Sequence, residues 1–144
     1  HRCPFDVCEQ ICKRLMVPVS ETRLLMESRY KAENRLGFIA SNFPVSRQEL
    51  YWALINFKTE CILYIMALTK DEAVRKAISN FYTDYRHVKP LIRGRDLINI
   101  GVKPGPEFTE IFSQILNAKL DGDLDTRKKE IAFAAAYARN KGLI

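Results

Sequence analysis

Apolar residues recur every three or four positions along most of this chain of 144 residues. That spacing places apolar side chains on one face of an α-helix, whereas a half-buried strand would alternate apolar and polar residues with a period of two. No stretch sustains a period of two, and proline and glycine interrupt the helical pattern repeatedly. The sequence therefore predicts an all-α fold, an irregular bundle of about seven or eight helices joined by short loops.

Several residues indicate where the first helices begin and end. Pro18 should end a helix over residues 5–17, because proline cannot continue a helix. Ser20 is then expected to cap a second helix that runs to about residue 37. Ser46 and Glu49 have the spacing of a capping box, in which each side chain satisfies a backbone N–H at the start of a helix.

A strongly apolar helix is predicted in the middle of the chain. Residues 60–68 are apolar on nearly every side, so we expect this helix at the centre of the bundle. Thr69 is expected to cap the helix that follows. Signals for later helix ends are Pro106 at a first helical position, Gly122 at a left-handed end, and Asp125 or Thr126 at an N-cap.

Length and composition favour one domain, or two small lobes that share a core. With 47% hydrophobic and 28% charged residues, the chain has the composition of a globular protein and not of a disordered one. We expect a helical body region over residues 1–90 and a helical tail region over residues 91–144, which could also form one continuous domain. The chain begins with His1 and not with Met, so we expect it to be a piece of a longer protein.

The apolar runs and the cysteines indicate the cellular compartment. The longest apolar run, residues 61–68, is far shorter than the ~20 residues that a membrane span needs, so we expect no membrane partner. The four cysteines have irregular spacing and no signal peptide is recognisable, which indicates reduced thiols in a cytoplasmic protein.

Motifs for catalysis and for cofactor binding are missing from the sequence. The chain has two histidines, His1 and His87, and neither belongs to a metal-binding pair or to a His-Glu-x-x-His helix. A phosphate-binding loop with the Gly-x-x-x-x-Gly-Lys-Ser/Thr pattern is also missing. We therefore expect no catalytic residue, no metal and no cofactor in this chain alone.

Two groups of residues could be interpreted as metal ligands. Asp121, Asp123 and Asp125 are spaced like the start of a calcium loop, but Thr126 and Ala132 stand where such a loop needs Gly and Glu. We interpret these aspartates as acidic caps at a joint between two helices. The cysteines lack the paired Cys-x-x-Cys spacing of zinc knuckles, which favours buried apolar thiols over zinc ligands.

Positive charge is concentrated in two stretches of the chain, whose formal net charge is +6. Residues 86–105 contain five Lys or Arg and one acidic residue, and residues 127–144 contain five and one again. A basic surface attracts polyanions, because each phosphate that it neutralises releases condensed counterions. The same charge would also suit a merely solvated face, so composition favours nucleic-acid binding only slightly.

A turn with two prolines adds a more specific signal. Pro104, Gly105 and Pro106 form a stiff turn that leads directly into a helix. The free N–H groups at the start of that helix could receive a phosphate, with Lys103 beside them. Glu107 would partly neutralise such a site, and the turn could instead fix the angle between two helices, so both readings stay open.

The residues around this turn carry a family resemblance. Residues 94–108 read GRDLINIGVKPGPEF, and LDGDLDTR follows over residues 120–127. Together they contain Gly-x-Asp-Leu, Gly-x-x-Pro-Gly-Pro, Leu-Asp-Gly and Thr-Arg in order. This pattern resembles the C-terminal region of bacterial class II tRNA nucleotidyltransferases, the CCA-adding and A-adding enzymes and their poly(A) polymerase relatives. Residues 85–92 resemble the segment that leads into it, and residues 20–84 agree as a helical body of matching length.

The resemblance implies a parent enzyme with an N-terminal catalytic head. In the family, this head adds nucleotides to the 3′ end of tRNA with Mg²⁺ and ATP or CTP, while a helical neck, body and tail grip the tRNA. The strand-borne Asp-x-Asp and the Gly-Ser loop of such a head are missing here. The family therefore implies a non-catalytic RNA-binding C-terminal region, which positions tRNA or another structured RNA for a head that lies elsewhere in the parent chain.

We expect the RNA contacts at basic residues and at the turn between the prolines. The expected contacts are Arg93, Arg95, Lys103, Gly105, Arg127, Lys128, Lys129, Arg86 and Lys89. Contacts to the RNA backbone set the register of binding and carry little sequence information. Asp96 is expected to cap its own short helix, because a carboxylate beside RNA phosphates would repel them.

Two other classes of function stay open. A helical protein-interaction or dimerisation module, such as a homodimer, would dock its partner on the face with Tyr51 and Trp52 or on the apolar helix over residues 61–68. Such a module predicts an exposed apolar patch. A helical enzyme would require three residues to converge in a pocket: Tyr82, Asp84 and His87.

Overall fold

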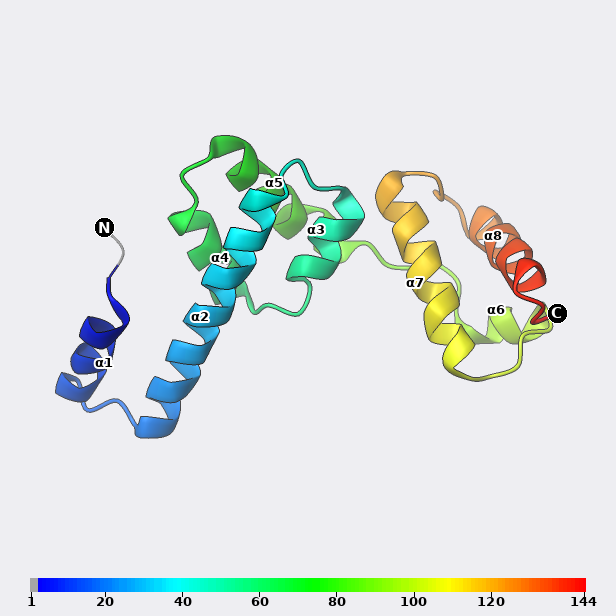
Figure 1. Ribbon diagram of the computed structural model, residues 1–144. Helices are drawn as coiled ribbons and strands as arrows, with labels where there is room; N and C mark the ends of the chain where they lie inside the picture. The colour runs from blue at the N-terminus through cyan, green and yellow to red at the C-terminus, as the bar shows by residue number, and fades with distance from the viewer. Residues whose placement is uncertain (1–2) are drawn as a thin grey trace. The chain divides into compact units, whose positions relative to one another are not determined.

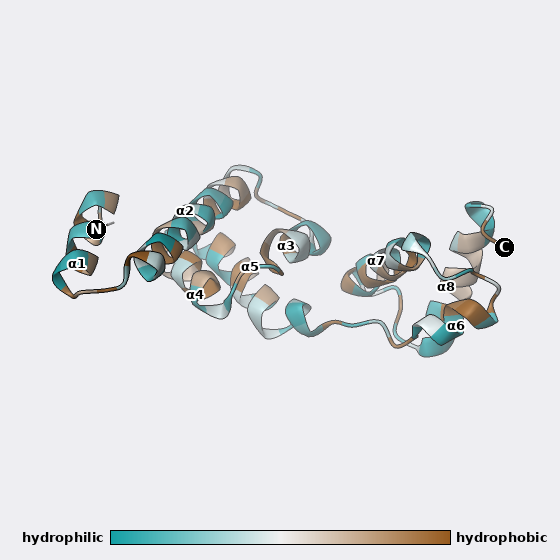
Figure 2. Ribbon diagram, turned by 90° about the horizontal axis from the view of Figure 1, so that it is seen from below, coloured by the Kyte–Doolittle hydropathy of each residue, from teal (hydrophilic) through white to brown (hydrophobic). Residues whose placement is uncertain are grey.

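The computed structural model describes residues 3–144, which form eight α-helices and one short 3₁₀ helix with no strand among them (Figure 1). The prediction of an all-α fold is confirmed. The chain divides into two compact units, His1–Thr83 and Asp84–Ile144. Most helices carry hydrophobic residues on one side and hydrophilic residues on the other (Figure 2). Over the described residues, no helix is both long enough and apolar enough to cross a membrane.

Five helices build the N-terminal unit. They are α1 (Phe5–Arg14), α2 (Val19–Ser41), α3 (Arg47–Leu54), α4 (Thr59–Leu68) and α5 (Glu72–Thr83). Within this unit α2 packs against α4, and α3 packs against α5. Fully buried side chains from these four helices form its core: Ile39, Leu54, Ile62, Ile65, Val74, Ile78 and Phe81.

The capping box at the start of α3 is confirmed. The N–H of Glu49 donates to Ser46 Oγ at 3.1 Å, and the N–H of Ser46 donates to the Glu49 carboxylate at 2.8 Å. The cap predicted for α2 is wrong, because Ser20 lies inside that helix. Pro18 holds the N-cap position, and its carbonyl accepts the N–H of Thr22 at 2.9 Å. Proline suits this place because it needs no N–H partner there.

Thr69 was expected to begin a helix, and it ends one instead. It is the C-cap of α4, and its buried hydroxyl donates to the carbonyl of Ile65 at 2.9 Å. The residue that caps α5 is Asp71, whose carboxylate accepts the N–H of Ala73 at 2.8 Å. Thr69 and Asp71 are both common cap residues, and the spacing alone did not decide between them.

The prediction that residues 60–68 lie at the centre of the bundle is wrong. Ile62 and Ile65 are buried, but Leu63 on the same helix is 49% exposed. The helix α4 therefore packs on one side only. The two first helices also end elsewhere than expected. The helix α1 stops at Arg14, two residues before Met16 takes a left-handed conformation at φ 55°, and α2 continues through Gly37 to Ser41.

The C-terminal unit contains a 3₁₀ turn and three α-helices. They are η1 (Tyr85–His87), α6 (Gly94–Asn99), α7 (Pro106–Asp121) and α8 (Arg127–Asn140). Here α8 packs against both α6 and α7. The buried core of this unit consists of Ile92, Leu97, Val102, Ile111, Ile115, Leu124, Ala134 and Ala138.

The helix ends predicted in this unit are confirmed. Pro106 occupies the first turn of α7, and Gly122 ends the helix in the left-handed conformation at φ 92°. Of the two residues considered for the cap of α8, Thr126 fills it, because its hydroxyl accepts the N–H of Lys129 at 3.4 Å. These helix ends determine where α7 starts and stops and where the basic first turn of α8 begins.

Candidate nucleic-acid interface

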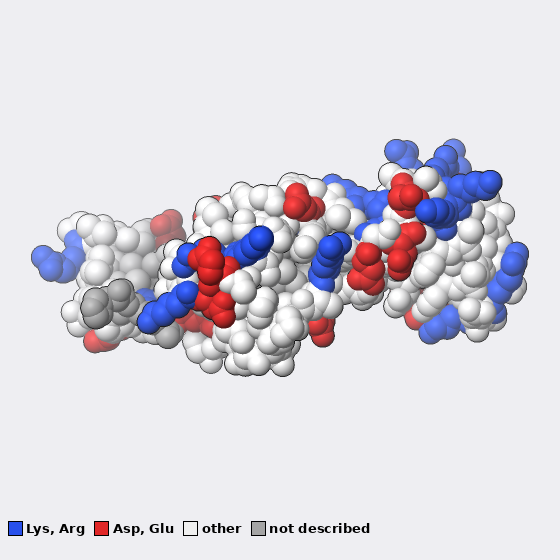
Figure 3. All heavy atoms as spheres, turned by 90° about the horizontal axis from the view of Figure 1, so that it is seen from above, with Lys and Arg blue, Asp and Glu red and all other residues white. Residues whose placement is uncertain are grey.

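Three of the predicted contact residues surround one hollow in the C-terminal unit. Arg93 precedes α6, Arg95 lies in its first turn, and Arg127 begins α8. Together with Leu91 and Asp96, they line a hollow of about 540 Å³. Basic side chains gather over this unit with acidic ones among them (Figure 3). The fold thus brings together cations that lie more than thirty positions apart in the sequence.

A buried carboxylate holds the backbone in front of Arg93. Glu130 on α8 is 0% exposed, and its Oε2 accepts the N–H groups of Leu91 at 2.7 Å and of Ile92 at 3.0 Å. Its Oε1 accepts a hydrogen bond from Lys119 Nζ at 2.6 Å. Both oxygens are therefore occupied, and the charge is balanced by Lys119, which is itself only 12% exposed. This arrangement connects α7 and α8 to the extended segment that leads into α6.

In the sequence, Glu130 is noticeable only as the one acidic residue of the basic stretch over residues 127–144. A signal for its burial was nevertheless present, because Glu130, Ala134 and Ala138 are spaced four residues apart. That spacing places them on one helix face. All three are 0% exposed. An acidic residue in line with two small apolar ones marks a side chain that must find partners inside the unit.

Asp96 connects the start of α6 to the start of α8. Its Oδ2 accepts the N–H of Arg93 at 2.8 Å, and its Oδ1 accepts a hydrogen bond from the Arg127 guanidinium at 2.7 Å. The hydrogen bond from the Arg93 backbone, followed by that from Arg127, lowers the pKa of Asp96 below its usual value. The prediction that Asp96 caps its short helix is confirmed. In addition, it orients Arg127 towards the hollow.

The other predicted cations differ in whether an acidic side chain forms an ion pair with them. Lys129 Nζ lies 2.8 Å from Asp125 Oδ1, and this hydrogen bond lowers the pKa of Asp125. Five more form no ion pair with any residue between positions 3 and 144: Lys89, Arg93, Arg95, Lys103 and Lys128. All five are exposed, so their charges are available to a ligand. Arg86 in η1 is partly buried.

The residues of the turn between the prolines do not line the hollow. A Cβ atom at Gly105 would clash with Glu107 Oε2, so the carboxylate of Glu107 folds back over this glycine. Negative charge thus already occupies the neighbourhood of the first N–H groups of α7. Lys103 is exposed just before the turn. Of the two readings of this turn, the geometry favours a structural joint over a phosphate site.

The residues expected to form a dimerisation surface or an enzyme site lie in different environments. Tyr51 is 7% exposed and packs its ring against Phe81 with centroids 6.2 Å apart, whereas Trp52 is 45% exposed. Of that pair only Trp52 presents a large apolar surface. Asp84 and His87 are both exposed. Among residues 3–144, no three His, Cys, Asp or Glu side chains come close enough together to hold a metal ion.

The fold and this surface define a class of protein, an all-helical chain whose C-terminal unit gathers three arginines around a hollow. An A-adding tRNA nucleotidyltransferase of Geobacter sulfurreducens is 33% identical to it over 131 residues, which cover 88% of this chain and 15% of the relative. An A-adding tRNA nucleotidyltransferase of Halalkalibacterium halodurans is 27% identical over 79 residues, which cover 55% of this chain and 18% of the relative. No family model and no solved structure matches.

This chain is therefore a sequence relative of the A-adding tRNA nucleotidyltransferases, and the resemblance seen in its residues is confirmed. It spans less than a fifth of the length of the two curated relatives.

Proposed function

We propose that this chain is the RNA-binding C-terminal region of a tRNA nucleotidyltransferase. In this role it catalyses no step, and it holds tRNA so that the 3′ end reaches a catalytic head elsewhere in the parent protein. The relatives named above are A-adding enzymes that act on tRNA, which supports tRNA as the ligand. The observation that carries the proposal is the hollow lined by Arg93, Arg95 and Arg127.

The geometry of this hollow suits a phosphate backbone. Arg93 and Arg95 have exposed guanidinium groups, which can bind phosphate oxygens through two parallel hydrogen bonds. Glu130 and Asp96 fix the backbone and Arg127 around them before any ligand arrives. Contacts of this kind recognise the shape of a folded RNA and not its sequence. Lys128 and Lys103 would extend the contact along the strand.

Nucleotide addition itself would belong to the head. Mg²⁺ and ATP or CTP are what the family would require there. The described residues of this chain offer no matching set of ligands, since no three acidic, His or Cys side chains come together among them. We therefore derive no catalytic step for this chain and assign it the positioning of the substrate alone.

The proposal is tested by binding of tRNA to the full 144-residue chain between about 50 and 200 mM salt. We expect binding that weakens steeply with salt and is tighter than binding of a DNA duplex of equal length. The double variant Arg93→Gln with Arg95→Gln should lower the salt slope by about 2, since each lost phosphate contact lowers it by about 1. Lys76→Gln, an exposed lysine of the other unit, is the matched control.

If the double variant binds tRNA as the unchanged chain does, the hollow is not the contact surface. If the chain does not bind tRNA even at low salt, autonomous RNA binding is excluded. Association between copies of the chain that is insensitive to salt would instead favour the dimerisation module.

A further inference from the structure

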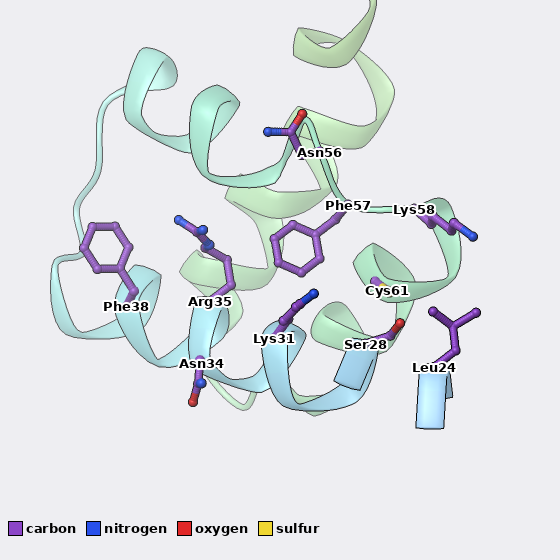
Figure 4. A pocket seen from close by; sticks show the side chains of 10 residues that line it. All are labelled: Leu24, Ser28, Lys31, Asn34, Arg35, Phe38, Asn56, Phe57, Lys58 and Cys61. Carbon is purple, nitrogen blue, oxygen red and sulfur yellow. The ribbon is translucent and has the colours of Figure 1, made fainter. Parts of the chain in front are cut away.

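The N-terminal unit carries a basic surface of its own. Figure 4 shows a groove of about 770 Å³ between α2 and the connection from α3 to α4. That volume lies within the range of ~300–1,000 Å³ typical of ligand sites. Its lining residues come from two short stretches of chain: Leu24, Ser28, Lys31, Asn34, Arg35 and Phe38 from α2, and Asn56, Phe57, Lys58 and Cys61 from the other side.

The charges in this groove have one sign. Lys31, Arg35 and Lys58 line it, and no carboxylate does. The unit as a whole is nearly balanced, because residues 3–83 contain 11 Lys or Arg and 9 Asp or Glu. A neighbouring groove of similar size is strongly apolar, and its two carboxylates, Glu21 and Glu60, are matched by two cations, Arg29 and Lys58. The first groove has cations alone, so an anion would be drawn to the first groove more strongly than to the second.

The helix face that borders the groove is unusual for a packing surface. Leu24, Ser28, Lys31, Arg35 and Phe38 are spaced three or four residues apart, so they form one stripe along α2. The core of the unit is served by the adjoining edge of the same helix, where Ala32 and Ile39 are buried. A stripe in which two cations, Lys31 and Arg35, lie between the apolar residues Leu24 and Phe38 fits a ligand that has both charge and flat apolar surface.

An aromatic ring stands in the middle of the groove. Phe57 and Lys31 point into the same space, with Arg35 beside them (Figure 4). The Arg35 guanidinium lies 5.8 Å from the centre of the Phe57 ring. The position of Phe57 is fixed by its backbone, because its N–H donates to the carbonyl of Leu54 at 2.9 Å. Lys58 is held as the N-cap of α4.

We propose that this groove binds single-stranded RNA, with one base stacked on Phe57 and its phosphates held by Lys31, Arg35 and Lys58. Aromatic rings bordered by cations bind single strands in this way, because every base has a flat face and every nucleotide has a charge. The side-chain amides of Asn34 and Asn56 line the same space and can donate to or accept from base edges. The inference goes beyond the proposed function and does not rest on it, since the two surfaces share no residue.

The first test measures binding of a fluorescently labelled RNA decamer, unpaired or in a duplex, to the full chain. We expect the single strand to bind and the duplex to compete poorly. Phe57→Leu should weaken binding of the single strand at least about fivefold, since it removes the stacking surface. Phe5→Leu is the matched control, because the Phe5 ring also carries an arginine, Arg29, at 4.3 Å but lies outside the groove.

A second variant keeps the test valid if Phe57→Leu disturbs folding. Lys31→Gln alters an exposed side chain and should lower the salt slope by about 0.7, the value for one phosphate contact on a single strand. Lys76→Gln should leave that slope unchanged. If Lys31→Gln and Phe57→Leu both bind as the unchanged chain does, the groove is not the site.

Two further arms separate this proposal from its competitors. AMP offers the same base and phosphate without a strand, and equal competition by AMP would overturn the assignment to RNA in favour of a free nucleotide. The double variant Arg93→Gln with Arg95→Gln should bind the decamer normally while its tRNA binding weakens. Weakened decamer binding in this variant would place the decamer at the hollow and overturn the groove, whereas unchanged tRNA binding with normal decamer binding would overturn the hollow alone.

Discussion

The carboxylate of Glu130 on α8 accepts the backbone N–H of Ile92 at 3.0 Å, across thirty-eight positions of sequence. Neither residue would attract notice by itself, since one is an acid in a basic helix and the other is a buried aliphatic. Their contact is what places the segment before Arg93 against α8. The stability of the C-terminal unit and the position of its arginines are therefore coupled.

Replacing Glu130 should destabilise the C-terminal unit strongly. Glu130→Gln removes the negative charge beside Lys119 Nζ, which lies 2.6 Å away and is largely buried. Leaving one partner of a buried ion pair uncompensated typically costs about 3–5 kcal/mol of unfolding free energy. Urea denaturation followed by circular dichroism measures the loss, and hydrogen exchange at the Leu91 and Ile92 amides should accelerate.

Asp123→Asn, an exposed change in the same unit, is the control for the Glu130 variant and should leave stability nearly unchanged. The double variant Glu130→Gln with Lys119→Met should recover part of the loss, because no buried charge then lacks a partner. A loss of the same size in the double variant would show that the ion pair is not the cause.

The bond between Asp96 and Arg127 should make stability depend on pH in the acid range. The pKa of Asp96 is lower in the folded protein than in the unfolded chain, because the Arg93 N–H and the Arg127 guanidinium favour the ionised form. The unfolded chain then binds a proton more readily, so the stabilisation is complete above the ordinary pKa near ~4 and is lost as the pH falls through the folded value.

Asp96→Asn therefore should lower stability at pH 7, and the difference from the unchanged chain should shrink towards zero as the pH falls. Thermal unfolding at a series of pH values measures this difference, again with Asp123→Asn as the control. A difference that stays constant from neutral to strongly acid pH would contradict the assigned ion pair.

Tyr137 should titrate at unusually high pH. Its hydroxyl donates to Glu110 Oε1 at 2.6 Å, and this hydrogen bond, with the negative charge of Glu110, raises the pKa of Tyr137 above its ordinary value. Lys141 Nζ lies 2.8 Å from the same oxygen and lowers the pKa of Glu110. NMR titration with labelled tyrosine rings should show high midpoints for Tyr137 and for Tyr51, whose pKa is raised by burial. Glu110→Gln should lower the midpoint of Tyr137 alone, and Tyr137→Phe should delete it.

Two glycine substitutions should have opposite signs. Gly122 ends α7 at φ 92°, a conformation in which a Cβ atom is strained, so Gly122→Ala should destabilise by about 1–2 kcal/mol. Gly37 lies inside α2 and a Cβ atom there would meet nothing within 4 Å. Gly37→Ala should therefore stabilise by about 0.5–1 kcal/mol. Chemical denaturation of both variants measures the contrast, and equal signs would contradict the assigned backbone conformations.

Local signals in the sequence predicted local structure well. Ser46, Glu49, Pro106 and Gly122 each act through bonds to residues within one turn, so spacing alone identifies them. The signals failed where two candidates of similar chemistry were neighbours, as with Thr69 and Asp71. They failed also for α4, because the apolar character of Leu63 does not reveal that about half of its surface stays exposed.

The candidate site was predictable only in part. The basic stretches and the family pattern pointed to Arg93, Arg95 and Arg127, but which cations stay free depends on partners far away in the sequence. Lys129 is paired and Lys128 beside it is not, although composition treats them alike. The groove around Phe57 was missed for the same reason, since its basic and aromatic residues belong to separate stretches of chain that only the fold brings together.

The occupied oxygens of Glu130 also bear on how quickly an RNA could be captured. A loop that has to become ordered on binding loses conformational entropy at that moment, and its association slows. The backbone before Arg93 is already held in place by two N–H bonds to one carboxylate. An incoming phosphate would meet arginines that need only rotate their side chains. The rate of association would then be set by diffusion and by long-range electrostatic attraction. The lifetime of the complex would be set by the contacts themselves.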